Sequence, residues 1–128
     1  MLRMLPNVFT ILRKAMLAGG CVAWEWPQRC DYWEYPQILD MIQTFKLSKV
    51  FTKGCAFGLA SVIPKTLGAP MSKTWAIATN CEPMHCLMKR ECTCRRDHAA
   101  CRGRDASHSE TYTAKFVDCI HKSFKEFV

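Results

Sequence analysis

A dense group of metal-binding residue types lies between positions 92 and 101 and limits how this chain can fold. It contains Cys92, Cys94, His98 and Cys101, which carry the two kinds of ligand that suit zinc best. The close pairs Cys92/Cys94 and His98/Cys101 can fold back onto one ion if each cysteine is a thiolate and the histidine is neutral. The pattern therefore predicts a zinc site, although its spacing matches no standard zinc finger.

The alternative is that these residues are free thiols in a positively charged loop. Neighbouring arginines would then lower the pKa of the cysteines and make them reactive. We favour metal binding, because free thiols packed so closely would be oxidised readily. Residues outside the segment add further candidate ligands, namely Cys55, Cys81, His85 and Cys86.

The cysteine content also bears on the compartment. In a secreted protein the nine cysteines would pair as disulfides and leave one over. Secretion requires a signal peptide, but Arg13 and Lys14 interrupt the apolar run near the N-terminus and no small-residue cleavage site follows convincingly. No apolar stretch reaches the ~20 residues that span a bilayer. We therefore expect an intracellular protein, in the cytoplasm or nucleus, with no membrane partner; a secreted disulfide protein is the alternative.

The formal net charge of +7 favours polyanionic partners, nucleic acid before acidic membrane. Basic residues concentrate over the Cys/His segment, which predicts a nucleic-acid contact there. The alternative is that the basic residues simply lie on a solvated surface and bind no partner. The candidate nucleic-acid-binding residues are Arg90, Arg95, Arg96, Arg102 and Arg104.

Hydrophobic periodicity predicts a single α/β domain over residues 1–128, with a Cys/His-rich loop at about 90–108. Gly19 and Gly20 mark the end of a first helix, Pro36 opens a second, and Asn80 is a plausible N-cap for a third. We expect a mixed or partly parallel sheet flanked by helices, a Rossmann-like partial fold. The predicted helices are 2–17, 37–45, 80–89 and 113–127, and the predicted strands are 21–26, 49–52 and 73–79.

No phosphate-binding glycine loop, Ser-His-Asp order or pair of catalytic carboxylates occurs in the sequence. Glu25, between Trp24 and Trp26 at the end of a predicted strand, is the one carboxylate placed to contact a ligand. An enzymatic role for it would require a concave pocket at that strand end. The alternative for Glu25 is an ordinary loop charge.

Several motifs occur together in a characteristic order. They are Gly-Gly-Cys-Val-Ala-Trp-Glu-Trp-Pro-Gln-Arg-Cys at 19–30, Gly-Cys-Ala-Phe-Gly-Leu at 54–59, Lys-Thr-Trp-Ala-Ile-Ala-Thr at 73–79, the Cys/His cluster at 92–103 and Tyr-Thr-Ala-Lys-Phe-Val-Asp-Cys-Ile-His-Lys-Ser-Phe at 112–124. Nearly the whole chain thus resembles an uncharacterised, multi-copy eukaryotic family whose members often occur in a mobile-element context. The resemblance implies that Cys55 is a metal ligand donated from a separate strand end. The family pattern has His-x-His before the cysteine matching Cys101, and here Arg96 stands at the first of the two histidine positions.

A more remote resemblance is to cytosine methyltransferases, which carry Glu-Asn-Val where this chain has Trp-Glu-Trp-Pro. The chain lacks a glycine-rich cofactor loop and a Pro-Cys nucleophile motif, so fold analogy alone supports that link. We expect a non-catalytic, zinc-stabilised domain of mobile-element origin that contacts nucleic acid through its basic loop. The alternative is a remnant C-terminal half of a nucleic-acid-modifying, methyltransferase-like enzyme.

Overall fold

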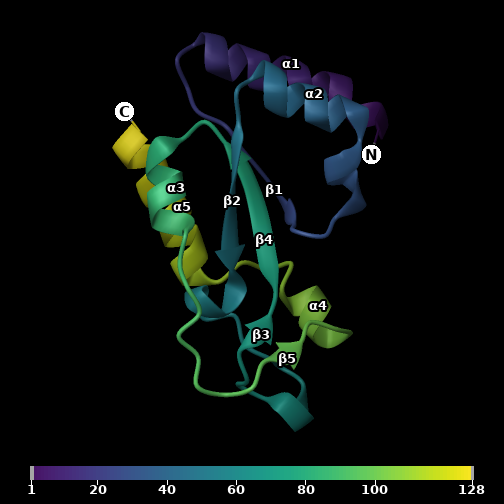
Figure 1. The fold of residues 1–128 in the computed structure, drawn as a ribbon, viewed down its shortest axis with the longest axis vertical. Coiled ribbons are helices and arrows are strands. Elements are labelled where there is room, and N and C mark those ends of the chain that lie inside the picture. The colour runs from purple at the N-terminus through teal and green to yellow at the C-terminus, as the bar shows by residue number, and fades with distance from the viewer. Residues whose placement is uncertain (1, 128) are drawn as a thin grey trace.

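The computed structural model describes residues 2–127 and combines helices with two small sheets (Figure 1). Four short 3-10 helices, η1 to η4, accompany the α-helices and strands. The helices are η1 Leu2–Met4, α1 Leu5–Leu17, η2 Asp31–Glu34, α2 Pro36–Thr44, η3 Gly54–Phe57, η4 Pro64–Thr66, α3 Glu82–Met88, α4 Arg104–His108 and α5 Ala114–Phe127. The strands are β1 Ala23–Pro27, β2 Ser48–Lys53, β3 Met71–Ser72, β4 Thr74–Thr79 and β5 Ala99–Ala100.

The main sheet has the order β1-β4-β2, and β4 is antiparallel to both neighbours. Its central residue Ile77 pairs with Glu25 on one side and Val50 on the other. Strands β1 and β2 therefore run in the same direction, joined through α2, as in a parallel crossover unit. The fold is mixed α/β as predicted, but β4 enters between these two strands. A Rossmann-like sheet has neighbouring parallel strands, so this sheet does not fit that part of the prediction.

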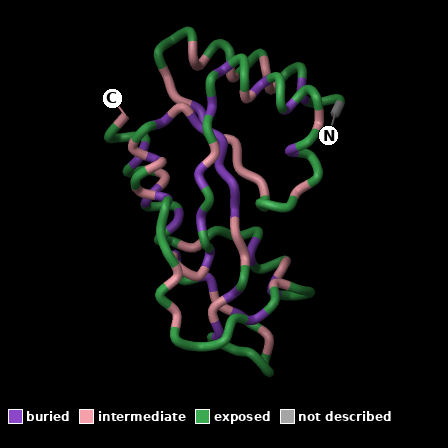
Figure 2. Tube along the Cα trace, viewed as in Figure 1, coloured by how far each residue is buried: buried purple, intermediate pink, exposed green. Residues whose placement is uncertain are grey.

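The main sheet is covered on both faces. Successive side chains of a strand point to opposite faces, and along β4 Trp75 and Ile77 join one apolar cluster while Ala76 and Ala78 join the other. The first cluster includes residues of α3 and α5, and the second includes residues of α1 and α2. The result is a three-layer arrangement in which the sheet supplies most of the buried strand residues seen in Figure 2.

Most element boundaries predicted from local sequence features agree with the structure, and two predictions differ from it. Asn80 does not cap α3: its side-chain Oδ1 accepts a hydrogen bond from the backbone of Val22 at 2.8 Å, which ties the start of β1 to the end of β4. The N-cap residue of α3 is Cys81, which makes no side-chain capping bond. The predicted loop 90–108 also contains ordered structure, namely β5 and α4.

A second sheet forms next to the N-terminal end of β4. It consists of the two-residue strands β3 and β5, paired in parallel with Met71 opposite Ala99. This pairing returns the chain after α3 to the neighbourhood of η3. Among residues 2–127, no helix has the length and apolar character required to cross a membrane.

Candidate metal centre

Cys55 is presented by η3, directly after β2. Its neighbour Gly54 is buried, and a Cβ there would lie 2.7 Å from Leu59 Cδ2, so a larger residue would require the Leu59 side chain to shift. The Gly54 N–H donates to the carbonyl of Lys73 at 2.8 Å, and Gly58 ends the turn in the left-handed region at φ +82°. These contacts hold the half-buried thiol of Cys55 at the end of the main sheet.

The segment that carries Cys92, Cys94 and His98 is anchored at both ends. At its start, the carbonyl of Met88, the last residue of α3, accepts a hydrogen bond from Thr52 Oγ1 of β2 at 3.1 Å. At its end, the N–H of Ala99 donates to the carbonyl of Pro70 at 2.8 Å as β5 begins. The loop is therefore drawn over the end of β2, where η3 lies.

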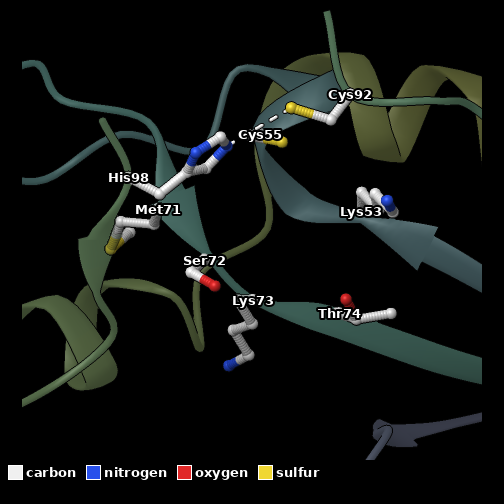
Figure 3. Close-up of a pocket in the computed structure, with 8 residues that line it drawn as sticks. All are labelled: Lys53, Cys55, Met71, Ser72, Lys73, Thr74, Cys92 and His98. Carbon is white, nitrogen blue, oxygen red and sulfur yellow. Dashed lines mark hydrogen bonds between the residues drawn. The ribbon is translucent and has the colours of Figure 1, made fainter. Parts of the chain in front are cut away.

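One ligand atom from each of Cys55, Cys92, Cys94 and His98 lies within 4.8 Å of the other three. The Sγ of Cys92 and the Nε2 of His98 are 3.3 Å apart (Figure 3). Zinc–sulfur bonds of about 2.3 Å in a tetrahedron place neighbouring sulfurs about 3.8 Å apart. A contraction of about 1 Å or less would thus bring the four atoms to tetrahedral distances.

The electrostatics of the group suit a cation. Burial, together with the neighbouring thiols of Cys92 and Cys94, raises the pKa of Cys55 to about 12. Hydrogen bonds, first from the backbone of Cys94 and then from other thiols, lower the pKa of Cys92 to about 7. A divalent cation favours the ionised form of every thiol that coordinates it. With four protein ligands the group is of the closed type that structural metal sites use.

Cys101, a predicted ligand, lies outside this group. Its Sγ lies 3.5 Å from Ser109 Oγ, and its half-buried side chain packs against the apolar cluster that contains Trp75 and Ile77. Cys101 follows β5 on the same, inward side as the buried Ala99, whereas His98 is exposed. The predicted pairing of His98 with Cys101 on one ion is therefore not what the structure shows, and Cys55 stands in place of Cys101.

Three additional candidates also lie elsewhere. Cys81 is buried and its Sγ donates to the carbonyl of Ser123 at 3.5 Å. His85 Nε2 lies 3.0 Å from Ser48 Oγ. Cys86 is exposed on α3, and all nine cysteines are free thiols in this structure.

Three members of this group, Cys55, Cys92 and His98, line a cavity of about 280 Å³ (Figure 3). Lys53, Ser72, Lys73 and Thr74 also line it. Sequence reasoning did not single out these residues. The segment 71–74 changes from β3 to β4 within two positions, and no residue pattern indicates which of its side chains face the cluster.

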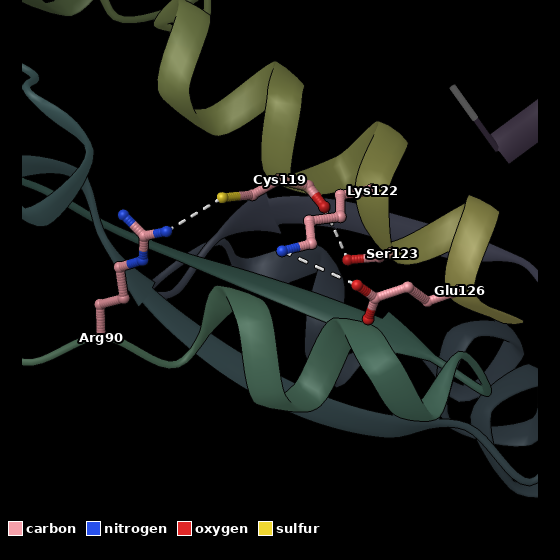
Figure 4. A network of polar contacts seen from close by, with 5 residues as sticks. All are labelled: Arg90, Cys119, Lys122, Ser123 and Glu126. Atoms are coloured by element: carbon pink, nitrogen blue, oxygen red, sulfur yellow. Dashed lines mark hydrogen bonds and ion pairs between the residues drawn. The ribbon is translucent and has the colours of Figure 1, made fainter.

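The predicted nucleic-acid-binding arginines divide into two kinds. The guanidinium of Arg90 lies 4.6 Å from the ring centre of Phe57 and donates to Cys119 Sγ at 3.1 Å (Figure 4), so it packs the loop onto α5. Arg95 and Arg96 line a groove of about 270 Å³ next to Cys94. The remaining two, Arg102 and Arg104, are exposed.

The arginines of the loop carry unneutralised charge. Among residues 2–127, the ion pairs are Lys53–Glu91 at 3.9 Å and Lys122–Glu126 at 3.8 Å, and neither involves an arginine. Exposed guanidinium groups without a carboxylate partner are available to bind anions.

Glu25 does not point from a convex surface into solvent. Its carboxyl group lines a cavity of about 280 Å³ between β1 and α5, and Tyr112 donates a hydrogen bond to it. Burial raises the pKa of Glu25, and the hydrogen bond and the charge of Lys73 partly oppose this shift. Sequence reasoning identified Glu25 but missed Tyr112, which lies 87 positions away.

Searches of protein-family models, curated proteins and solved structures found no match to this chain.

Proposed function

We propose that this chain is a non-catalytic domain stabilised by a structural zinc ion bound by Cys55, Cys92, Cys94 and His98. The observation that carries the proposal is the convergence of four ligand atoms within 4.8 Å from two separate segments. Three thiols and one imidazole form a ligand set that zinc favours over magnesium or calcium. Four protein ligands leave no open position for a substrate, which favours a structural role.

The physical role of the ion would be to staple the loop after α3 to the end of β2. Cys55 lies directly after β2, where the hydrogen bond from Gly54 to Lys73 holds it, and the other three ligands lie in the loop. Most loop residues from 89 to 98 are exposed, so apolar burial contributes little to holding them in place. Metal coordination supplies the constraint that packing does not.

The test is the metal content of protein purified under reducing conditions without a histidine tag. We expect about one zinc ion per chain, because the four ligands complete one tetrahedron. Cys92→Ser and His98→Ala should lower the content, whereas Cys86→Ser, an exposed cysteine outside the group, should not. A reduced protein that neither retains nor takes up zinc would refute the proposal.

A second proposal is that the basic loop contacts nucleic acid through Arg95, Arg96, Arg102 and Arg104. It is supported by their lack of ion-pair partners among residues 2–127 and by the groove beside Arg95 and Arg96. Arg90, the fifth predicted residue, contributes less because Phe57 and Cys119 engage its guanidinium.

Four phosphate contacts predict that log K falls with log salt with a slope of about −3 to −4, because counterions are released on binding. The double variant Arg95→Gln/Arg96→Gln should reduce this slope by about 2. Arg3→Gln/Arg13→Gln, with the same change of charge on η1 and α1, is the matched control. Binding that does not depend on salt, or no binding to DNA or RNA, would refute this second proposal.

An origin in mobile elements and an intracellular location are proposals supported by motif resemblance and cysteine content. The alternative of a methyltransferase-like remnant depends on Glu25, which does line a cavity. The antiparallel order of the main sheet gives this alternative less support than a parallel sheet would.

A further inference from the structure

The cavity between β1 and α5 lies outside the metal group and outside the basic loop. Its volume is about 280 Å³, and its walls are mostly apolar, with Ile77 of β4 and Phe116 and Ile120 of α5 among them. Glu25 and Tyr112 are its polar residues. A concave apolar site with a few converging polar groups is the usual form of a small-molecule site.

Glu25 is incompletely satisfied in this site. One oxygen of its carboxyl group accepts the hydrogen bond from Tyr112, whereas Oε1 is buried and has no hydrogen-bond partner among residues 2–127. The nearby cation is engaged elsewhere, because Lys73 Nζ donates to Ser109 Oγ at 2.7 Å and lies 5.5 Å from the ring centre of Trp75. Buried polar atoms without partners are rare in proteins and call for an explanation.

When Glu25 is ionised, the partner of Oε1 is a hydrogen-bond donor, and a cationic donor matches the charge of the carboxylate best. The rings of Tyr112 and Phe116, stacked with centres 4.7 Å apart, give the site an aromatic wall. The remaining walls favour an apolar body. The volume lies at the lower end of the range for ligand sites, which indicates a small molecule.

We propose that this cavity binds a small protonated amine with an aromatic or aliphatic body, whose ammonium group pairs with Glu25. Carboxylic acids are excluded by repulsion from the same carboxylate. Burial raises the pKa of the empty Glu25, and a bound ammonium group would offset that shift. The site is independent of the zinc proposal, so each can fail without the other.

The test titrates the full chain, purified under reducing conditions, with 2-phenylethylamine and, separately, with 2-phenylethanol, in which a neutral hydroxyl group replaces the ammonium group. Amide chemical shifts report the affinity and show whether the ligand perturbs β1 and the first half of α5. We expect the amine to bind at least about tenfold more tightly than the alcohol, because hydrogen bonds to charged groups are the stronger kind. Phenylacetate should not bind.

Glu25→Gln keeps the shape of the side chain and removes its charge. We expect this variant to lose the preference for the amine while binding the alcohol as before. Equal affinities of the wild-type protein for amine and alcohol would overturn the proposal, as would saturable amine binding away from the cavity. Absence of saturable amine binding at millimolar concentration would also overturn it, and these three measurements need no variant to fold.

Discussion

The two-segment origin of the ligand group makes Cys55 different from the other three ligands. Cys92, Cys94 and His98 lie within seven consecutive residues, so an ion held by them alone closes only a short loop. Cys55 lies 37 positions before Cys92 (92 minus 55), and its bond to the ion closes a long one. We therefore predict that Cys55→Ser removes most of the stabilisation by zinc, whereas Cys94→Ser removes less.

The magnitude follows from loop closure. Cross-linking a loop of this length lowers the entropy of the unfolded chain by about 13 cal/mol/K, or about 4 kcal/mol at room temperature. With an unfolding entropy of about 2.1 cal/mol/K per residue, this corresponds to a rise of roughly 15 °C in Tm for 128 residues. This value covers loop closure alone, and the movement that the native ligands need to reach tetrahedral distances reduces it.

The assay is thermal unfolding followed by circular dichroism, with each protein measured in EDTA and in saturating zinc. The difference between the two conditions isolates the metal-dependent part of stability from any packing change at the mutated site. Cys86→Ser should keep the full zinc-dependent rise in Tm. Equal losses of that rise in Cys55→Ser and Cys94→Ser at saturating zinc would refute the loop-closure reasoning.

Three further predictions concern the fold and its pH dependence. Asp105→Ala should cost about 1–3 kcal/mol in urea unfolding, because Asp105 is buried and the Val62 N–H that donates to it at 2.8 Å would lose its partner; an unchanged midpoint would contradict this. Phe116→Ala should cost about 3–5 kcal/mol in the same assay, because its buried ring contacts Phe57, Trp75 and Tyr112. The pKa of Glu25 is raised above its ordinary 4.5, so the folded state binds more protons than the unfolded state, and this stabilising contribution is present below pH 4.5 and lost as pH rises through the folded-state pKa. Unfolding curves measured from pH 4 to 7.5 should therefore show Glu25→Gln gaining stability relative to the wild-type protein as pH rises, and a constant difference would contradict this sign.

Secondary structure was predictable from the sequence because its determinants are local. Gly19 and Gly20 follow the end of α1, Pro36 is the first residue of α2, and the apolar pattern of 113–127 coincides with α5 to within one residue. Sheet order was not predictable in the same way. The placement of β4 between β1 and β2 depends on contacts between segments more than 20 residues apart, which no local pattern encodes.

The candidate site shows the same division. The spacing predicted that Cys92, Cys94, His98 and Cys101 converge on one ion, and the structure brings the first three together with Cys55. Spacing could not exclude Cys101, because its position depends on the two-residue strand β5, which leaves it on the inward side. Cys55 was one of four candidates outside the segment, and only the resemblance singled it out, since 37 positions separate it from Cys92.

The end of the molecule around β3, β5 and α4 combines apolar burial with buried polar groups, and this explains why a metal would be useful there. Around the main sheet, large apolar side chains from both helical layers form the two buried clusters. Around β3, β5 and α4 the strands are two residues long, and the polar residues Asp105 and Ser109 are buried there alongside the apolar Met71 and Ala99. Hydrogen bonds of this kind contribute modestly to net stability because they replace bonds to water. Coordinate bonds from Cys55 to the loop would add, for the exposed loop residues, to the apolar burial that Phe57, Leu59 and Met71 provide at this end.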